Sequence, residues 1–324
     1  MDTTSPQLHR VDVEDKDTAR AFSDILQSFL PYSLTVLGLL HNGDLNPANG
    51  RRNLQVWTSF PFQPGVPPPA LFSAITYSRW QEEVWVQFFC SAEILQNPPT
   101  KDEEQHVTSF VHEFVRAVKT ENAVVQGVDC AAVLARKPGG NGVNIGSLNN
   151  RWVDCLSPTS KPLENVYVKF VYRPDFDGEI PEWRTSEGEW EVTDVRESDL
   201  EFMNSRATFP RTREFLVGRL PYSVCIRRKG DDGPPVAWEM IYPDGGAGML
   251  HVEEEFRGAG LARKCVAALS AKMAGMFREG AAGKYPRVRW EMTDVNVGNK
   301  AGLRLAGTRR GWKQTWLCHW MVIQ

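Results

Sequence analysis

Apolar and polar residues follow two different periods along this chain, and each period predicts one kind of secondary structure. The longer segments with apolar residues at helical spacing predict helices over residues 15–30, 34–40, 101–119 and 261–278. Pro31 should end the first helix, and Asp15 or Asp17 should cap its start. Shorter helices are expected after Ser198 or Asp199 and over residues 211–220 and 299–309.

Strands are expected where short runs rich in Val, Ile, Phe and Trp lie between Pro, Gly or Asn residues. The segments that fit this pattern are residues 54–60, 71–77, 83–90, 124–134, 165–171, 191–195, 223–228, 236–242, 287–292 and 313–323. Residues 138–150, rich in Gly and Asn, predict a mobile loop. Residues 173–188, rich in Pro, Asp, Glu and Gly, predict a linker.

The predicted elements repeat in order on the two sides of this linker. Each side has helices, then three strands, a long helix and a further strand. A chain of 324 residues is long for one domain and comfortable for two. We therefore expect two domains, 1–180 and 181–324, of the α+β class. Each should be an α/β/α sandwich with a mixed, mainly antiparallel sheet flanked by helices.

Composition describes an ordinary globular protein. The net charge is −3 and 24% of residues are charged, so no basic excess points to nucleic acid. The six cysteines include no C-x-x-C pair, so a zinc site is not indicated and no metal is expected. The start of the chain is polar and acidic, and no apolar run could span a bilayer. We expect a cytoplasmic protein with reduced thiols and no membrane partner, either a monomer or a homodimer.

The segment from Met249 to Arg278 combines a strand end, a glycine turn and a long helix. The first turn of a helix carries unpaired N–H groups and about half a positive charge, which suits an anion such as phosphate. Gly258 and Gly260 allow close approach to the backbone, and Arg257 adds a cation. A turn needed only for tight strand-to-helix packing is the alternative. No Walker motif is present, and Arg263 interrupts the dinucleotide-binding pattern.

The spacing of Arg257, Gly260 and Ala262 after a strand resembles the acyl-CoA pyrophosphate signature R/Q-x-x-G-x-G/A of the GNAT superfamily of N-acyltransferases. Residues 288–294 resemble the fifth strand of that family, residues 299–305 resemble its next helix, and Gly311-Trp312 resembles its usual exit. Residues 215–224 and 235–240 are most similar to its glycine N-acyltransferase-like branch. The resemblance covers about residues 189–324. It implies two GNAT-like domains in tandem, of which the first, lacking the motif, is degenerate.

The resemblance implies direct attack of an amine on the thioester of acetyl-CoA or another acyl-CoA, without a metal. The residues then expected to bind this co-substrate are Leu250, His251, Val252, Arg257, Gly258, Ala259, Gly260, Leu261, Ala262 and Asn299. Two usual catalytic positions depart from the family pattern. Ala306 stands where the family usually has a Tyr that acts as general acid, and Gly246 stands where the branch has a Glu that acts as general base. The substitutes are His251, Glu239 and Asp244, although His251 could equally be a partly buried strand residue.

A small-molecule amine, possibly an amino acid, is the expected acceptor. A carboxylate on it would suit an arginine, and the candidates are Arg206, Arg211 and Arg213, each of which could instead be a surface residue. Residues Glu253–Glu255 read as a solvated turn. Two other functions stay open: a non-catalytic acyl-CoA-binding or interaction module, and a protein or peptide N-acetyltransferase.

Overall fold

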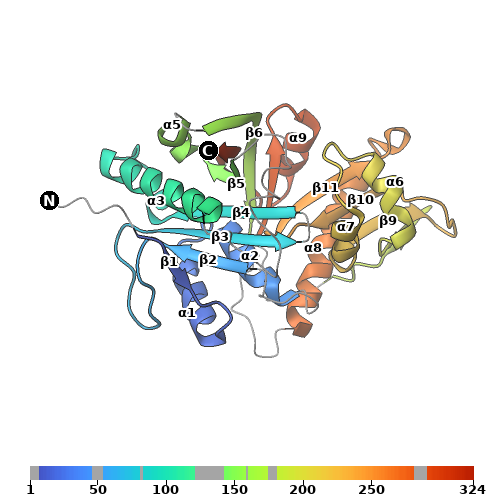
Figure 1. The fold of residues 1–324 in the computed structure, drawn as a ribbon. Helices are drawn as coiled ribbons and strands as arrows, with labels where there is room; N and C mark the ends of the chain where they lie inside the picture. The colour runs from blue at the N-terminus through green and yellow to red at the C-terminus, as the bar shows by residue number, and fades with distance from the viewer. Residues whose placement is uncertain are drawn as a thin grey trace.

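The computed structural model describes residues 7–45, 54–80, 83–120, 142–157, 160–173, 181–280 and 290–324. The strands of these residues form one 13-stranded sheet in the order β1-β2-β3-β4-β5-β13-β6-β12-β11-β10-β9-β8-β7. Helices flank this sheet, which runs through the whole molecule (Figure 1). All neighbouring strands are antiparallel except the pairs β4–β5 and β11–β12, which are parallel. The predicted fold class, a mainly antiparallel sheet flanked by helices, is confirmed.

The first half of the chain contributes six strands and four α-helices within the described residues. In chain order they are β1 (His9–Val11), α1 (Lys16–Gln27), α2 (Leu34–Leu45), β2 (Leu54–Thr58), β3 (Ser73–Trp80), β4 (Glu83–Cys90), α3 (Lys101–Thr120), β5 (Val143–Asn149), α5 (Val153–Leu156) and β6 (Ser160–Tyr172). Asp15 caps α1 as predicted, because its Oδ2 accepts the backbone N–H of Thr18 at 2.8 Å.

The second half repeats this order after a short strand, β7 (Ser186–Glu187). Its elements are β8 (Trp190–Thr193), α6 (Leu200–Ser205), α7 (Arg213–Arg219), β9 (Ser223–Arg228), β10 (Ala237–Ile241), β11 (Gly246–Val252), α8 (Leu261–Gly280), β12 (Glu291–Asn296), α9 (Lys300–Thr308) and β13 (Lys313–Ile323). Each of these has a counterpart in the first half, from β1 and β8 through to β6 and β13. The predicted repeat of element order is therefore present in the structure.

The two halves exchange strands within the sheet. Strand β6 of the first half lies between β12 and β13 of the second half and pairs antiparallel with both. Strand β13 also pairs antiparallel with β5, so the last strand of the chain joins the first half. The predicted boundary near residue 180 falls at the edge of residues 174–180, which lie outside the described residues, and it stays a prediction.

Alternate side chains of the strands pack on opposite faces of the sheet. One face packs against α1, α2, α6 and α7, and its core includes Trp238 and Met240 of β10. The other face packs against α3 and α5 in the first half and against α8 in the second, where Ala237 of β10 lies. Helix α9 packs on the same side as α8, over Val168 and Phe170 of β6.

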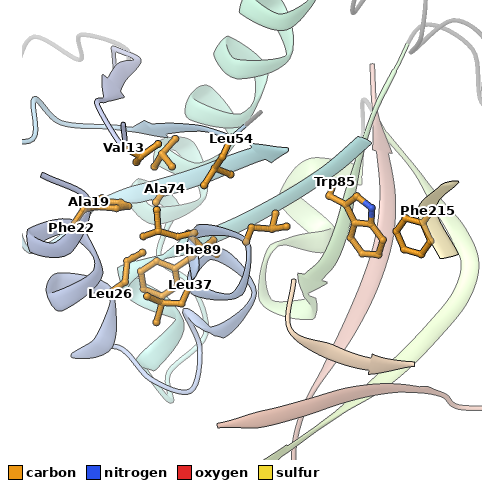
Figure 2. Packing of buried hydrophobic residues seen from close by; sticks show 14 of the residues in the cluster. Val13, Ala19, Phe22, Leu26, Leu37, Leu54, Ala74, Trp85, Phe89 and Phe215 are labelled. Atoms are coloured by element: carbon orange, nitrogen blue, oxygen red, sulfur yellow. The ribbon is translucent and has the colours of Figure 1, made fainter. Parts of the chain in front are cut away.

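An aromatic cluster joins the two halves on the α6–α7 face. Trp85 of β4 stacks on Phe215 of α7, with ring centroids 6.2 Å apart and an interplanar angle of 8° (Figure 2). Its ring also lies 5.6 Å from that of Tyr242 and 6.0 Å from that of Trp320. Trp85 is 3% exposed, so the halves share a core as well as a sheet.

Some predicted elements differ from the structure. Within residues 138–150, predicted as a loop, residues 143–149 form strand β5, whose Val143 and Ile145 are buried against β13. Strand β12 spans residues 291–296 and so extends beyond residue 292, where the predicted strand was expected to end; residues 287–289 of that prediction lie outside the described residues. The strand predicted over residues 124–134 lies outside the described residues. Asp199 precedes α6 but makes no side-chain cap bond. Its carboxylate accepts the N–H of Arg196 and pairs with Arg227.

Candidate functional site

The turn between β11 and α8 has a backbone conformation that requires glycine. Gly258 has a φ of +88° and Gly260 a φ of +81°, both in the left-handed region. A Cβ added to either residue would meet none of the described atoms within 4 Å. Close strand-to-helix packing therefore does not explain these two glycines. They form an open turn directly before Leu261, the first residue of α8.

This turn exposes an arginine and the start of a helix to solvent. Residues 257–260 are exposed, and the first N–H groups of the 20-residue helix α8 follow them. Arg257 folds back so that its Nε donates to the carbonyl oxygen of Val252 at 3.2 Å. Arg263 and Lys264 lie on the first turn of α8, where Lys264 Nζ is 3.2 Å from Glu187 Oε2. The arrangement suits an anion of the size of a phosphate or diphosphate.

Strand β11 separates from β12 soon after it begins. In the part of the chain that the structure describes, the two strands pair only at Gly246–Met292 and Ala247–Thr293, where the Thr293 hydroxyl donates to the carbonyl oxygen of Ala247 at 3.0 Å. Beyond this point the strands diverge toward the glycine turn. Residues 248–252 of β11 are only partly buried, and within the described residues they are not paired with β12.

A β-bulge lies in the middle of this diverging strand. Trp238 pairs with His251 and Met240 with Gly248, so Glu239 alone faces two residues, Met249 and Leu250. Met249 has a φ of +53°, a conformation that non-glycine residues rarely adopt. Backbone strain of this kind gathers at functional sites. The bulge changes the direction of the backbone of residues 250–252.

His251 projects from the bulge onto the α6–α7 face. Its ring stacks on Trp238, with centroids 4.6 Å apart and an interplanar angle of 20°. Its Nε2 lies 3.2 Å from Glu253 Oε1, to which Arg206 Nε also donates at 3.0 Å. Burial lowers the pKa of His251 below its usual 6.5, against the opposing effect of Glu253. His251 is therefore mainly neutral at neutral pH and can accept a proton.

Glu239 lies on the opposite face, under α8. It is 4% exposed, and burial raises its pKa to about 8, helped by the nearby carboxylate of Glu291 and opposed by Arg309. Glu291 also has a raised pKa because it is buried, and it accepts a hydrogen bond from the Ser270 hydroxyl of α8. Among the described residues, Oε2 of Glu239 has no hydrogen-bond partner. Glu239 and His251 thus do not meet.

Asp244 lies in the turn that leads into β11, at the junction of the two halves. Its Oδ1 accepts the N–H of Gly246 at 3.0 Å, and its Oδ2 accepts Gln87 Nε2 of β4 at 3.3 Å. Burial raises its pKa, against the attraction of buried Lys169. Asp244 therefore connects the start of β11 to the first half of the chain.

The three candidate arginines have different surroundings. Arg206 donates to Glu253, and exposed Arg213 pairs with Glu197 on the surface. Arg211 lies over the rings of Trp85, Phe215 and Tyr242, with 5.5 to 5.6 Å between its Cζ and each ring centroid.

Other positions singled out in the sequence lie in helices or turns. Asn299 caps α9, because its Oδ1 accepts the N–H of Gly302 at 2.9 Å. Ala306, at the position of the usual tyrosine, is buried against Val168 and Phe170. Glu254 and Glu255 are exposed as expected, whereas the partners of Glu253 show that it is not part of a solvated turn.

The counterpart of α8 in the first half is unsuited to an anion. The first turn of α3 carries Asp102, Glu103 and Glu104. Thr100 and Glu103 form a reciprocal cap there, with the Thr100 N–H donating to Glu103 Oε2 at 2.9 Å and the Glu103 N–H donating to Thr100 Oγ1 at 3.2 Å. These carboxylates face the positive end of the helix, where an anion would otherwise bind.

The described residues contain no metal-binding cluster, no disulfide between their cysteines and no membrane-spanning helix. No group of three or more His, Cys, Asp or Glu side chains is placed to hold a metal ion there. The five cysteines in this part of the chain are free thiols. None of the helices that the structure describes has the length and apolar character that crossing a membrane requires.

Sequence reasoning missed Glu253, Glu291 and Arg309 as members of the site. Glu253 had a detectable signal, because it lies two residues after His251 and such spacing brings side chains to one face of an extended segment. Glu291 and Arg309 approach Glu239 from β12 and from the end of α9. No local pattern shows that approach.

Comparison with known proteins identifies the fold. No protein-family model matches the chain, and no curated protein matches it by sequence. A solved structure of a Drosophila protein is similar over 98% of both chains, at 15% identity and a TM-score of 0.62. A GCN5-related N-acetyltransferase from Sphaerobacter thermophilus is similar over 98% of this chain and 95% of its own, at 12% identity and a TM-score of 0.50. Over nearly its whole length, this chain therefore has the fold of GCN5-related N-acetyltransferases.

Proposed function

We propose that this protein is an acyl-CoA-dependent N-acyltransferase, most simply an N-acetyltransferase, that acts on the amine of a small molecule. One observation carries the proposal. An open turn with left-handed Gly258 and Gly260 leads into the long helix α8, directly after a bulged strand that diverges from its neighbour. The fold shared with an N-acetyltransferase supports the same reading.

The residues of the turn fit the diphosphate of coenzyme A. The backbone N–H groups of residues 258–262 would bind its oxygens, while Arg257 would leave the carbonyl of Val252 to pair with it. The edge of β11 from Leu250 to Val252 would hold the pantetheine arm and the thioester. A preorganised N–H directed at a developing oxyanion contributes about 3 kcal/mol to catalysis.

His251 is the proposed general base. With its hydrogen on Nε2, directed at Glu253, the neutral ring keeps Nδ1 to accept a proton from the amine. The Trp238 stack and the Arg206–Glu253 pair would hold the ring in this orientation. A base on the α6–α7 face places the acceptor there, on the opposite side of the sheet from α8.

An amino acid is the proposed acceptor, as in the glycine N-acyltransferase-like branch. Arg211 is the best placed of the three arginines to receive its carboxylate. The guanidinium lies against Tyr242, and the ring of Tyr242 packs so closely on Gly248 that a Cβ there would lie 2.4 Å from it. Arg211 is thus connected to β11 next to the bulge. Arg206 pairs with Glu253 beside His251, and Arg213 lies on the surface next to Glu197.

A non-catalytic acyl-CoA-binding module is the second candidate. It is favoured by Ala306 and Gly246, which stand where the family usually has its general acid Tyr and its general base Glu.

Two measurements test the proposal. Calorimetry with acetyl-CoA should detect binding that Arg257→Glu weakens, and the surface variant Arg213→Glu should bind normally. Absence of binding to the unmodified protein, with acetyl-CoA and with longer acyl-CoAs, would refute both candidates.

Thiol release is then followed with amino acids, with amines that lack a carboxylate, and with peptides. Release with amino acids supports the transferase. Binding without release on any amine supports the non-catalytic module, and turnover on peptides alone supports a peptide N-acetyltransferase.

A further inference from the structure

Glu239 and His251 approach the bulge of β11 from opposite faces of the sheet. His251 is paired with Trp238, and the next residue of β10, Glu239, faces Met249 and Leu250. The His251 ring stacks on Trp238 on the α6–α7 face. Glu239 is the next residue along β10, and it interacts electrostatically with Cys265 of α8, on the other face. Two side chains that can bind a proton, Glu239 and His251, therefore lie beside the same bulge of β11, on opposite faces of the sheet.

The surroundings of Glu239 favour the neutral, proton-bearing carboxyl. Among the residues that the structure describes, the titratable groups near it are Cys265 of α8, Glu291 of β12 and Arg309 at the end of α9. Glu291 is held by Ser270, and Arg309 lies over the ring of Trp312 at 4.4 Å. Among the described residues no atom bonds Oε2 of Glu239, and a buried carboxylate without such a bond is costly. Cys265 keeps its own proton, because burial raises its pKa well above the usual value.

We propose that Glu239 gives its proton to the sulfur that leaves the acyl-CoA, a role that rests on the proposed function. The open edge of β11 at residues 250–252 is where the thioester would be held. Leu250 of this edge packs on the α8 side, the same side as Glu239. No donor comes from α9 at the usual place, since Ala306 is a core residue there.

The step balances in atoms and electrons. The amine nitrogen forms a bond to the acyl carbon, and the carbon–sulfur bond breaks with its electron pair on sulfur. The O–H bond of Glu239 breaks and its proton joins the sulfur, while His251 takes the proton that the amine loses. Glu239 loses one proton and His251 gains one. Transfer of a proton from His251 to Glu239 through solvent then restores the starting state. Groups whose surroundings move their pKa values in opposite directions commonly divide acid and base roles in this way.

Glu239→Gln tests the proposal, because an amide keeps the shape of the carboxyl but has no proton to give. General acid catalysis contributes about 10²- to 10⁴-fold, and a thiolate needs little help, so we expect kcat to fall about 10²-fold. In the unmodified protein kcat should decline as pH rises above about 8, where Glu239 loses its proton, and the variant should lack this decline. Acetyl-CoA should bind both proteins equally by calorimetry.

Glu291→Gln is the matched control within the same cluster. The Glu291 carboxylate raises the pKa of Glu239, so its removal should move the decline in kcat to lower pH without abolishing it. A purely structural role for the cluster predicts that both variants change the rate alike and leave the pH profile in place.

Infrared spectroscopy gives a readout that does not depend on turnover or on the folding of a variant. The unmodified protein should show the C=O band of a protonated carboxyl that shifts when coenzyme A binds and not when desulfo-coenzyme A binds. Two results would overturn the role of Glu239 while leaving the proposed transferase activity standing. One is a C=O band that shifts equally with coenzyme A and desulfo-coenzyme A, and the other is a Glu239→Gln enzyme with an unchanged rate and pH profile. Absence of acyl-CoA binding overturns the proposed function, and this role with it.

Discussion

Replacing Glu239 with Gln should change how the free energy of unfolding depends on pH. Glu239 is 4% exposed on β10, and burial raises its pKa from 4.5 to about 8. In the unfolded chain the carboxyl returns to its ordinary value. Between these two pKa values the folded state therefore binds one more proton than the unfolded state.

The size of the effect follows from proton linkage. One extra bound proton in the folded state lowers the free energy of unfolding by about 1.4 kcal/mol for each pH unit of increase. Over the interval from pH 4.5 to about 8 the loss is about 5 kcal/mol, and it is about 3 kcal/mol at pH 7. The contribution of the raised pKa is complete below pH 4.5 and is gone above about pH 8. The amide of the Glu239→Gln variant cannot ionise, so the variant avoids this loss.

Urea unfolding followed by tryptophan fluorescence measures the difference between the two proteins from about pH 5 to about pH 9. The variant should gain stability relative to the unmodified protein as pH rises across this range. Glu255→Gln, an exposed position, serves as the control and should give a difference independent of pH. A constant difference between the Glu239→Gln variant and the unmodified protein would refute the burial argument.

Three further predictions concern the turn, the base and the shared core. Arg257→Glu should weaken acetyl-CoA binding about 10- to 100-fold in calorimetry, because a charge-assisted hydrogen bond contributes about 1.5–3 kcal/mol. An unchanged Kd would contradict the placement of the diphosphate. His251→Gln should lower kcat/KM about 10²-fold and remove its decline at acidic pH, which falls below pH 6.5 because burial lowers the pKa of His251. A retained decline in steady-state profiles would point to another base. Trp85→Ala should cost about 3–5 kcal/mol in urea unfolding, since its buried ring, on β4 of the first half, packs against Phe215 and Trp320 of the second half. A cost similar to that of a surface substitution would contradict the shared core.

Local pattern predicted most of the regular elements. The span predicted for β9 is the one observed, and so is that of β13, because a run of strand-forming residues next to a turn marks both locally. Strand β5 was missed because its Gly and Asn residues resemble a loop. It becomes a strand through its pairing with β13, about 170 residues away in the chain, a non-local effect that no short window contains. In β12, Asp294 looks unlike a strand residue, yet it pairs with buried Lys169 of β6 at 2.7 Å.

The candidate site divides in the same way. The turn at residues 257–260 was predictable, because glycine at left-handed positions before a helix is a local signal. His251, Glu239 and Asp244 were predicted as candidate catalytic residues without separate roles, because the role of each depends on which face of the sheet it occupies. The bulge at Met249 decides that His251 lies beside Trp238. The position of α6 then decides that Arg206 reaches Glu253.

The insertion of β6 between β12 and β13 makes the second half dependent on the first. A shortened protein of residues 181–324 would keep the whole glycine turn, yet its sheet would lose a central strand. The facing edges of β12 and β13 would then expose unpaired backbone groups, which favour association with other chains. A gene fragment that encodes only the second half should therefore yield aggregated protein. The first half, which has no such glycine turn before α3, is needed to complete the sheet.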